Sequence, residues 1–119
     1  YLDNIKIKQF GRGCFIIEDP EEADIEAAKK GLDQCGLLLS NGEYDLIILD
    51  EINIALYYKL LRVSDVINAL KNKAPKVEVV LTGRYAPEEL IEMADLVTEM
   101  VEIKHYYKQG VTSRSGIDH

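Results

Sequence analysis

The sequence predicts an α/β fold, with helices layered around a largely parallel sheet. Short apolar runs alternate along the chain with longer segments of helical period, as in successive strand–helix units. The run Leu46–Leu49 is apolar at every position, which is typical of a central parallel strand with helices on both faces. The chain has 119 residues, is 47% hydrophobic and contains no linker, so we expect a single domain over residues 1–119.

The first part of the chain predicts a strand, a loop and a long helix. Residues 5–10 alternate apolar and polar side chains, as a half-exposed strand does, and glycines then indicate a loop. A helix is expected over residues 19–40. Asp19 is a candidate N-cap, Pro20 suits the first turn, and Glu22 has the capping-box spacing. Apolar residues recur along this helix at steps of three and four, which predicts one buried face made of Ile25, Ala28, Leu32, Cys35 and Leu39.

The second half of the chain continues the alternation of helices and strands. After the strand Leu46–Leu49, Ser64 is a candidate cap for the second of two helices, and Pro87 suits the start of a later one. The predicted elements are, in order, helices over residues 52–61 and 63–73, a strand over 77–81, a helix over 87–94 and a strand region over 95–105.

Charge and cysteine content exclude several classes of protein. The formal net charge of -7 would repel nucleic acids and anionic membranes, so we expect neither as a partner. No apolar run approaches the ~18 residues that a membrane span needs. The two cysteines, Cys14 and Cys35, form no CxxC pair and no disulfide framework, which favours a reduced, cytoplasmic setting.

Two groups of polar residues follow predicted strands, where ligands of open parallel sheets bind. Asp50 and Glu51 end the first of these strands. An aspartate in this place can hold Mg²⁺ against phosphate oxygens, and the following glutamate can orient water or the metal shell. The alternative is that Asp50 caps the next helix and Glu51 lies in its first turn.

The second group is Thr82, Gly83 and Arg84, directly after the strand over residues 77–81. It combines a hydroxyl, a flexible backbone and a guanidinium, and arginine suits bidentate contact with phosphate. The alternative is a turn with an arginine facing solvent. A P-loop of the form G-x-x-x-x-G-K-[ST] would complete a nucleotide site, but no window of the sequence matches it.

Four stretches carry a resemblance to a known family: "YDLIILDEINIAL", "VEVVLTGRYAPEELIEMADLVTEM", "VEIKHYYKQGV" and "GID". The chain resembles the ATP:corrinoid adenosyltransferases of the cob(I)alamin/cobyrinic acid a,c-diamide type. The resemblance implies a RecA-like P-loop fold, usually in a homodimer, that requires Mg²⁺. The implied reaction transfers the 5′-deoxyadenosyl group of ATP to the reduced cobalt of a corrinoid and releases triphosphate, with a reductase as a further candidate partner.

The resemblance also implies roles for individual residues. Asp50 and Glu51 correspond to the acidic motif at the metal and the phosphates, and the three residues Thr82–Arg84 to the motif beside the nucleotide. Gly11, Gly13 and Phe15 correspond to a loop near the corrinoid, which in many members continues with more aromatic residues. Cys14 could be imagined as a cobalt ligand, but a packing role in the loop is the preferred interpretation, since adenosyl transfer needs the lower axial position vacated.

The resemblance covers the C-terminal two-thirds or so of a typical member and lacks the strand and loop of the P-loop. We therefore expect the chain to be a fragment, with an exposed sheet edge and, by itself, weak ATP binding and no turnover. Two other interpretations stay open. The chain could be a P-loop NTPase domain of recombinase or kinase type, or a truncated, non-catalytic homologue that keeps only the fold.

Overall fold

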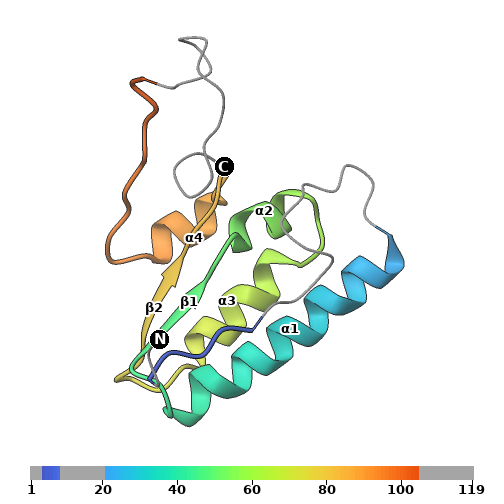
Figure 1. Ribbon diagram of the computed structural model, residues 1–119, viewed down its shortest axis with the longest axis vertical. Coiled ribbons are helices and arrows are strands. Elements are labelled where there is room, and N and C mark those ends of the chain that lie inside the picture. The colour runs from blue at the N-terminus through green and yellow to red at the C-terminus, as the bar shows by residue number, and fades with distance from the viewer. Residues whose placement is uncertain (1–3, 9–20, 105–119) are drawn as a thin grey trace.

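A computed structural model describes residues 4–8 and 21–104 of the chain (Figure 1). The helices and strands that form within these ranges follow one another in the predicted order, although two predicted strands are absent there. In order they are α1 (Glu22–Asn41), β1 (Leu46–Leu49), α2 (Ile52–Tyr57), α3 (Val63–Lys71), β2 (Glu78–Leu81) and α4 (Glu88–Met93). None of the helices in these ranges is both long and apolar enough to cross a membrane.

Strands β1 and β2 pair in parallel, with Leu46 opposite Glu78 and Leu49 opposite Leu81. The chain between them passes through α2 and α3, because two parallel strands need a crossover rather than a tight turn. The α/β prediction with a parallel sheet is therefore confirmed. The predicted bounds of the two strands agree with the observed ones to within one residue.

The core lies between one face of this sheet and the helices α1 and α3, which run side by side in Figure 1. Its fully buried side chains are Leu39 of α1, Val66 of α3 and Val77 just before β2. The inward-facing strand residues, Ile47, Leu49, Val79 and Leu81, pack against this cluster or are buried beside it. Burial of these aliphatic side chains is the main source of stability for such a layer.

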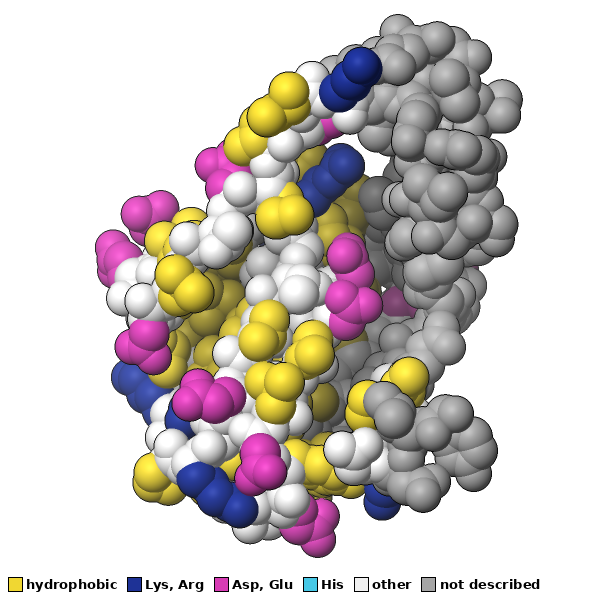
Figure 2. All heavy atoms as spheres, turned by 60° about the vertical axis from the view of Figure 1, so that its left-hand side comes forward, with side chains coloured by type: hydrophobic (Ala, Val, Ile, Leu, Met, Phe, Trp, Pro, Cys, Tyr) yellow, Lys and Arg dark blue, Asp and Glu magenta, His cyan; other side chains and the backbone are white. Residues whose placement is uncertain are grey.

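The other face of the sheet is open among the described residues. Leu46, Ile48 and Val80 are 52%, 58% and 44% exposed, and Figure 2 shows apolar side chains lying open on the side where β2 comes forward. The prediction that helices cover both faces of Leu46–Leu49 is thus wrong for this part of the chain, because α1 and α3 pack on the same face.

Helix α1 begins two residues later than a cap at Asp19 would require. Its N-cap is Glu21, which forms a reciprocal capping box with Asp24. The Glu21 N–H donates to Asp24 Oδ2 at 2.9 Å, and the Glu21 side chain accepts from the Asp24 backbone. Asp19 and Pro20 lie outside the described residues. The buried face is largely as predicted, with Leu39 buried and Ile25, Ala28, Leu32 and Cys35 half-buried.

The capping prediction for α3 is wrong. Arg62 is its N-cap, with no side-chain capping bond, and Ser64 lies inside the helix because the helix starts at Val63. Helix α2 ends at Tyr57 rather than running on to residue 61, because Lys59 adopts a left-handed φ of 61° that no α-helix accommodates.

Two predicted strands are not formed in the described residues. Residues 5–8 and 95–104 have no strand structure, and neither segment pairs with β1 or β2. Their alternating apolar pattern satisfies one requirement of a strand, but a strand also needs a hydrogen-bonding neighbour. Residues 9, 10 and 105 of these predictions lie outside the described ranges.

Candidate functional site

The turns that follow β1 and β2 meet at the carboxyl edge of the sheet. Because Leu49 lies opposite Leu81, the next residues, Asp50 and Thr82, are neighbours in space. The Thr82 hydroxyl donates to Asp50 Oδ1 at 2.8 Å and accepts from the Glu51 backbone N–H at 2.9 Å. One side chain thus uses both its donor and an acceptor to join the acidic turn to the second strand.

Backbone hydrogen bonds extend this junction in both directions. The Thr82 N–H donates to the carbonyl of Leu49, and the Asn53 N–H donates to the carbonyl of Thr82, each at 3.2 Å. The ladder of the parallel sheet therefore continues one residue beyond the strands and into the start of α2. This continuation fixes the separation of the two turns.

The backbone of these turns is strained. Glu51 and Tyr85 have φ values of 61° and 62°, in the left-handed region that non-glycine residues rarely adopt. Gly83 has a φ of 118°, and a Cβ atom there would lie 3.2 Å from Asn53 Cβ and 3.4 Å from Glu51 Cα. Only glycine fits this turn without a shift of its neighbours. Strain of this kind is concentrated at functional sites, where other contacts hold it in place.

The alternative role for Asp50, as a helix cap, is not observed. The N-cap of α2 is Glu51, whose side chain makes no capping bond, and the Asp50 carboxylate is engaged by Thr82 instead. Asp50 and Glu51 are exposed at the edge of the sheet. Both carboxylates are therefore accessible to a ligand.

The donor set fits a magnesium ion carried by a nucleotide rather than one held by protein alone. Carboxylate oxygens are the ligands that Mg²⁺ prefers, and the ion commonly takes one or two of them with phosphate oxygens and water. Asp50 and Glu51 are consecutive, exposed residues that offer such oxygens. No cluster of three or more His, Cys, Asp or Glu that could hold a metal occurs among the described residues. The remaining ligands would therefore have to come from phosphate and water.

Arg84 supplies a positive charge close to the carboxyl edge of the sheet. It lies two residues beyond Thr82, is exposed, and its guanidinium forms no hydrogen bond or ion pair with the residues that the structure describes. A guanidinium in this state presents its full set of donors to solvent. Carboxylates and a guanidinium thus emerge from adjacent strand ends, an arrangement suited to a metal-bound polyphosphate.

The sequence did not indicate a role for Asn53, a residue of α2 that binds the turn following β2. Its side chain is 5% exposed, and its Nδ2 donates to the carbonyl of Gly83 at 3.2 Å. A polar residue within the apolar stretch "INIAL" is a weak signal for such a contact. Tyr57 contacts the same turn: its ring stacks on Tyr85 with centroids 4.3 Å apart and planes 27° apart.

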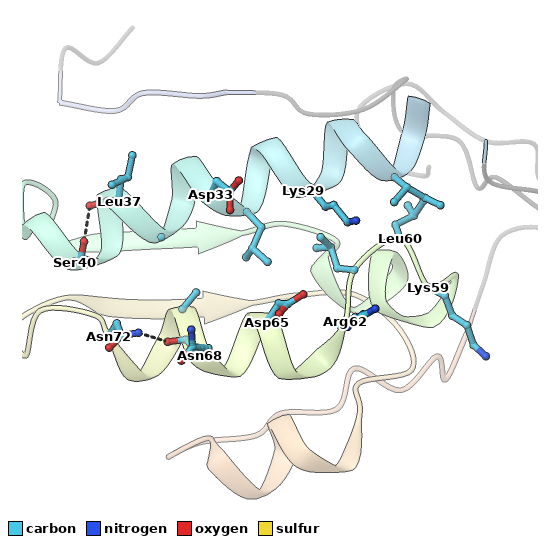
Figure 3. A pocket seen from close by; sticks show the side chains of 15 residues that line it. Lys29, Asp33, Leu37, Ser40, Lys59, Leu60, Arg62, Asp65, Asn68 and Asn72 are labelled. Carbon is cyan, nitrogen blue, oxygen red and sulfur yellow. Dashed lines mark hydrogen bonds between the residues drawn. The ribbon is translucent and has the colours of Figure 1, made fainter. Parts of the chain in front are cut away.

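A separate groove of about 600 Å³ lies between α1 and α3 (Figure 3). Its apolar floor is rimmed by charges of both signs, including Lys29 and Asp33 on α1 and Arg62 and Asp65 at the start of α3. None of the residues predicted to bind metal or nucleotide lines it. Mixed charge gives this groove no preference for an anionic ligand.

The predicted corrinoid residues Gly11, Gly13 and Phe15, together with Cys14, lie outside the described residues. The other cysteine, Cys35, is half-buried on α1. Burial raises the pKa of its thiol, and the nearby positive charge of Lys8 opposes the rise. A protonated thiol is a poor nucleophile, so Cys35 is suited to packing rather than to covalent chemistry.

Comparison with known proteins places the chain in a family. The sequence matches the family described as ATP:corrinoid adenosyltransferase BtuR/CobO/CobP over residues 1–119. The chain belongs to this family. A protein from Sinorhizobium named corrinoid adenosyltransferase is 40% identical, with 93% of this chain and 56% of the relative covered.

Two further relatives carry the same name. The protein of Pseudomonas aeruginosa is 31% identical over 99% of this chain and 58% of its own length. The protein of Escherichia coli K12 is 30% identical over 82% of this chain and 50% of its own length. The chain thus spans about half the length of the curated relatives that it matches.

Proposed function

We propose that this chain supplies the metal- and phosphate-binding edge of a corrinoid adenosyltransferase. The proposed reaction forms a bond between the cobalt of a reduced corrinoid and the 5′ carbon of ATP. Cobalt(I) donates the electron pair, the bond between the 5′ carbon and its oxygen breaks, and triphosphate leaves with that pair. The cobalt becomes formally cobalt(III), so no further oxidant is needed, and a reductase would supply cobalt(I) beforehand.

One observation carries this proposal: the Thr82 hydroxyl holds Asp50 and the Glu51 backbone together, and the exposed Arg84 follows Thr82 by two residues. Cobalt(I) is itself a strong nucleophile, so the protein needs no activated side chain. Its tasks are to align the reactants and to stabilise the charge of the leaving triphosphate. Acidic metal ligands and an arginine at the carboxyl edge of a parallel sheet suit the second task.

Magnesium would be held by Asp50 and Glu51. Bound there, the ion would neutralise charge on the phosphate oxygens and so make triphosphate a better leaving group. The Thr82 hydroxyl orients Asp50 by donating to Oδ1, which leaves Oδ2 directed to other partners. Arg84 would contact the same phosphate chain, and Gly83 would let the backbone approach it closely.

Several finer features belong to the same proposal. Residues 1–119 would form one domain within a P-loop NTPase fold of RecA type, in a cytoplasmic homodimer. Gly11, Gly13 and Phe15 would lie against the corrinoid. The match to the family along the whole chain supports these assignments, and the open apolar face of the sheet suits a position inside a larger assembly.

The test is an assay of the complete native protein with ATP, Mg²⁺ and a chemically reduced corrinoid. Visible absorption detects the light-sensitive cobalt–carbon product, and phosphorus NMR identifies the phosphate product. We expect triphosphate, and we expect Asp50→Asn to lower kcat/KM on the order of a hundredfold, because a ligand that acts on the leaving charge is lost.

Asp45→Asn is the matched control, since Asp45 is an exposed carboxylate at the opposite end of β1, and it should leave the rate unchanged. Release of ADP and phosphate without any corrinoid would favour an NTPase of another class. Binding of a corrinoid without turnover would favour a non-catalytic homologue. Full activity of Asp50→Asn would contradict the proposed role of the carboxyl edge in the reaction.

A further inference from the structure

Arg84 is flanked on both sides by residues that α2 holds in place. On one side, the Asn53 amide donates to the carbonyl of Gly83 at 3.2 Å. On the other side, the ring of Tyr57 stacks on Tyr85 with centroids 4.3 Å apart. Arg84 lies between these two residues in the chain, is exposed, and its guanidinium has no partner among the described residues, so the chain holds the backbone on either side of Arg84 and leaves its charge available.

The Asn53 contact does not serve stability alone. Its Oδ1 atom is buried and accepts no hydrogen bond from the described residues. A buried acceptor without a partner costs free energy, whereas the Gly83 carbonyl belongs to an exposed residue that water could satisfy. An apolar side chain of similar size would avoid this cost. The amide is therefore best explained by where it holds the Gly83 turn.

The Tyr57–Tyr85 stack has a similar character. Both rings are more than half exposed, at 54% and 58%, so the pair buries little apolar surface. Tyr85 also adopts a φ of 62°, which is unfavourable for a residue with a bulky side chain. The stack thus accompanies a strained backbone at Tyr85 although it buries little apolar surface. Contacts that hold strain without much burial indicate pre-organisation of the neighbouring group.

We propose that Asn53 and Tyr57 are positioning residues that pre-organise Arg84 for a polyphosphate anion. The ligand class rests on the proposed function, whereas the two contacts from α2 do not. Because a displaced arginine loses bidentate contact with phosphate, loosening either contact weakens binding of the anion more than it slows the chemical step. KM for ATP is therefore the sensitive quantity, and kcat changes less.

The decisive variant is Asn53→Leu in the complete native protein. It removes the donor to Gly83 and also the unsatisfied Oδ1, so its thermal midpoint should equal or exceed that of the wild type. We nevertheless expect its KM for ATP to rise on the order of tenfold, with kcat changed less than about threefold. A merely structural role for Asn53 predicts instead that activity follows stability.

A double-mutant cycle tests whether the effect passes through Arg84. In an Arg84→Ala background, Asn53→Leu and Tyr57→Leu should each change KM by less than about twofold, because the group that they position is gone. A tenfold rise that persists in this background overturns the proposal. Asn68→Leu, on an exposed face of α3, and Tyr44→Leu, before β1, are the matched controls and should leave KM unchanged.

Two readouts separate this proposal from the proposed function. Backbone amide NMR signals of residues 83–85 should shift in Asn53→Leu whether or not the protein is an enzyme, and unchanged signals overturn the positioning role. Binding of inorganic triphosphate with Mg²⁺, measured by calorimetry, should weaken in the same variant. If the wild type forms no cobalt–carbon bond but these shifts and losses occur, the proposed reaction fails and the positioning role stands.

Discussion

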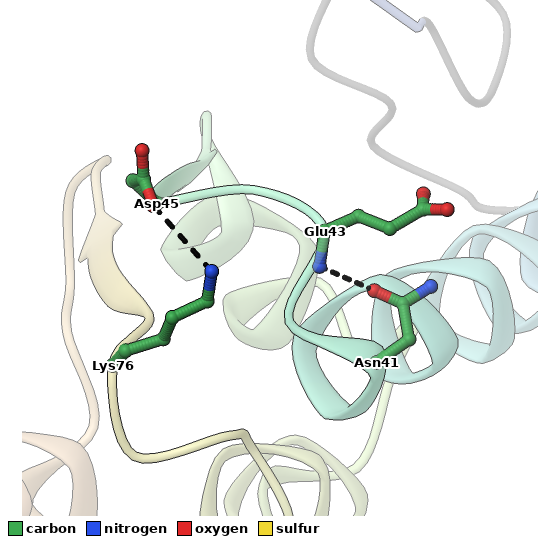
Figure 4. Close-up of polar contacts among 4 residues, drawn as sticks. All are labelled: Asn41, Glu43, Asp45 and Lys76. Carbon is green, nitrogen blue, oxygen red and sulfur yellow. Dashed lines mark hydrogen bonds and ion pairs between the residues drawn. The ribbon is translucent and has the colours of Figure 1, made fainter.

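The two ends of the β1–β2 sheet differ in how they are held together. At the carboxyl end, hydrogen bonds of the Thr82 side chain join residues some thirty positions apart, and Glu51 and Tyr85 take positive φ values. At the other end the side-chain contacts are looser (Figure 4): Lys76 Nζ lies 3.8 Å from Asp45 Oδ1, and the Glu43 N–H donates to the nearby Asn41 side chain. The positive φ near that end falls on Gly42, where it costs little.

We interpret this difference as one between a simple connection and the proposed site. The amino end is joined by backbone hydrogen bonds alone, from the Glu78 N–H to the Asp45 carbonyl at 2.9 Å and from the Ala74 N–H to the Leu39 carbonyl at 2.8 Å, while its side chains make only local or solvated contacts. The carboxyl end keeps Asp50 and Arg84 exposed, while Thr82 holds the Asp50 carboxylate and α2 contacts the residues on either side of Arg84. Such an arrangement resists relaxation and costs stability, which is expected where geometry serves a ligand rather than the fold.

The largest effect should follow from Gly83→Ala. The added Cβ would lie 3.2 Å from Asn53 Cβ, and the φ of 118° is one that alanine rarely adopts. We expect a loss of about 2 to 3 kcal/mol in the free energy of unfolding, measured by urea denaturation. The control is Gly36→Ala in α1, where a new Cβ meets nothing within 4 Å and should stabilise the helix by about 0.5 to 1 kcal/mol. Equal effects at the two glycines would remove the evidence for strain at the edge.

A smaller effect should follow from Thr82→Val. Valine keeps the shape of threonine but leaves the Glu51 N–H without its acceptor and Asp50 Oδ1 without its donor. Because both partners are partly solvated, we expect a loss of about 1 kcal/mol in the free energy of unfolding. Thr82→Ser keeps the hydroxyl and should restore most of the loss in the same denaturation experiment. Failure of serine to do so would assign the effect to packing of the methyl group.

The sequence was sufficient to predict the junction of the two strand ends. The apolar runs of β1 and β2 are short and clearly bounded, and a parallel register brings Asp50 and Thr82 together once both strands are assigned. The strand predictions for residues 5–8 and 95–104 were wrong. These segments have the sequence pattern of a strand, but no strand pairs with them among the described residues. Pairing is a tertiary property that the period of a segment does not contain.

The contacts from α2 could not be predicted for a related reason. Asn53 reaches Gly83 across 30 positions of sequence, and Gly83 has a positive φ in the turn that makes this contact. Stacking of Tyr57 on Tyr85 depends on the same turn. Motif patterns identify the charged groups of the site, whereas the residues that position them depend on the packing of the turns.

The smallest effect is expected at the amino end, from Asp45→Asn or Lys76→Gln. Both side chains of this ion pair are mostly exposed, so water and salt screen their attraction, and the cost of ordering two flexible side chains offsets what remains. The urea midpoint of either variant should match that of the wild type within experimental error, at both low and high salt. A clear, salt-dependent loss of stability would mean that the amino end is held by charge after all. The contrast between the two ends would then reflect the type of interaction rather than the demands of a site.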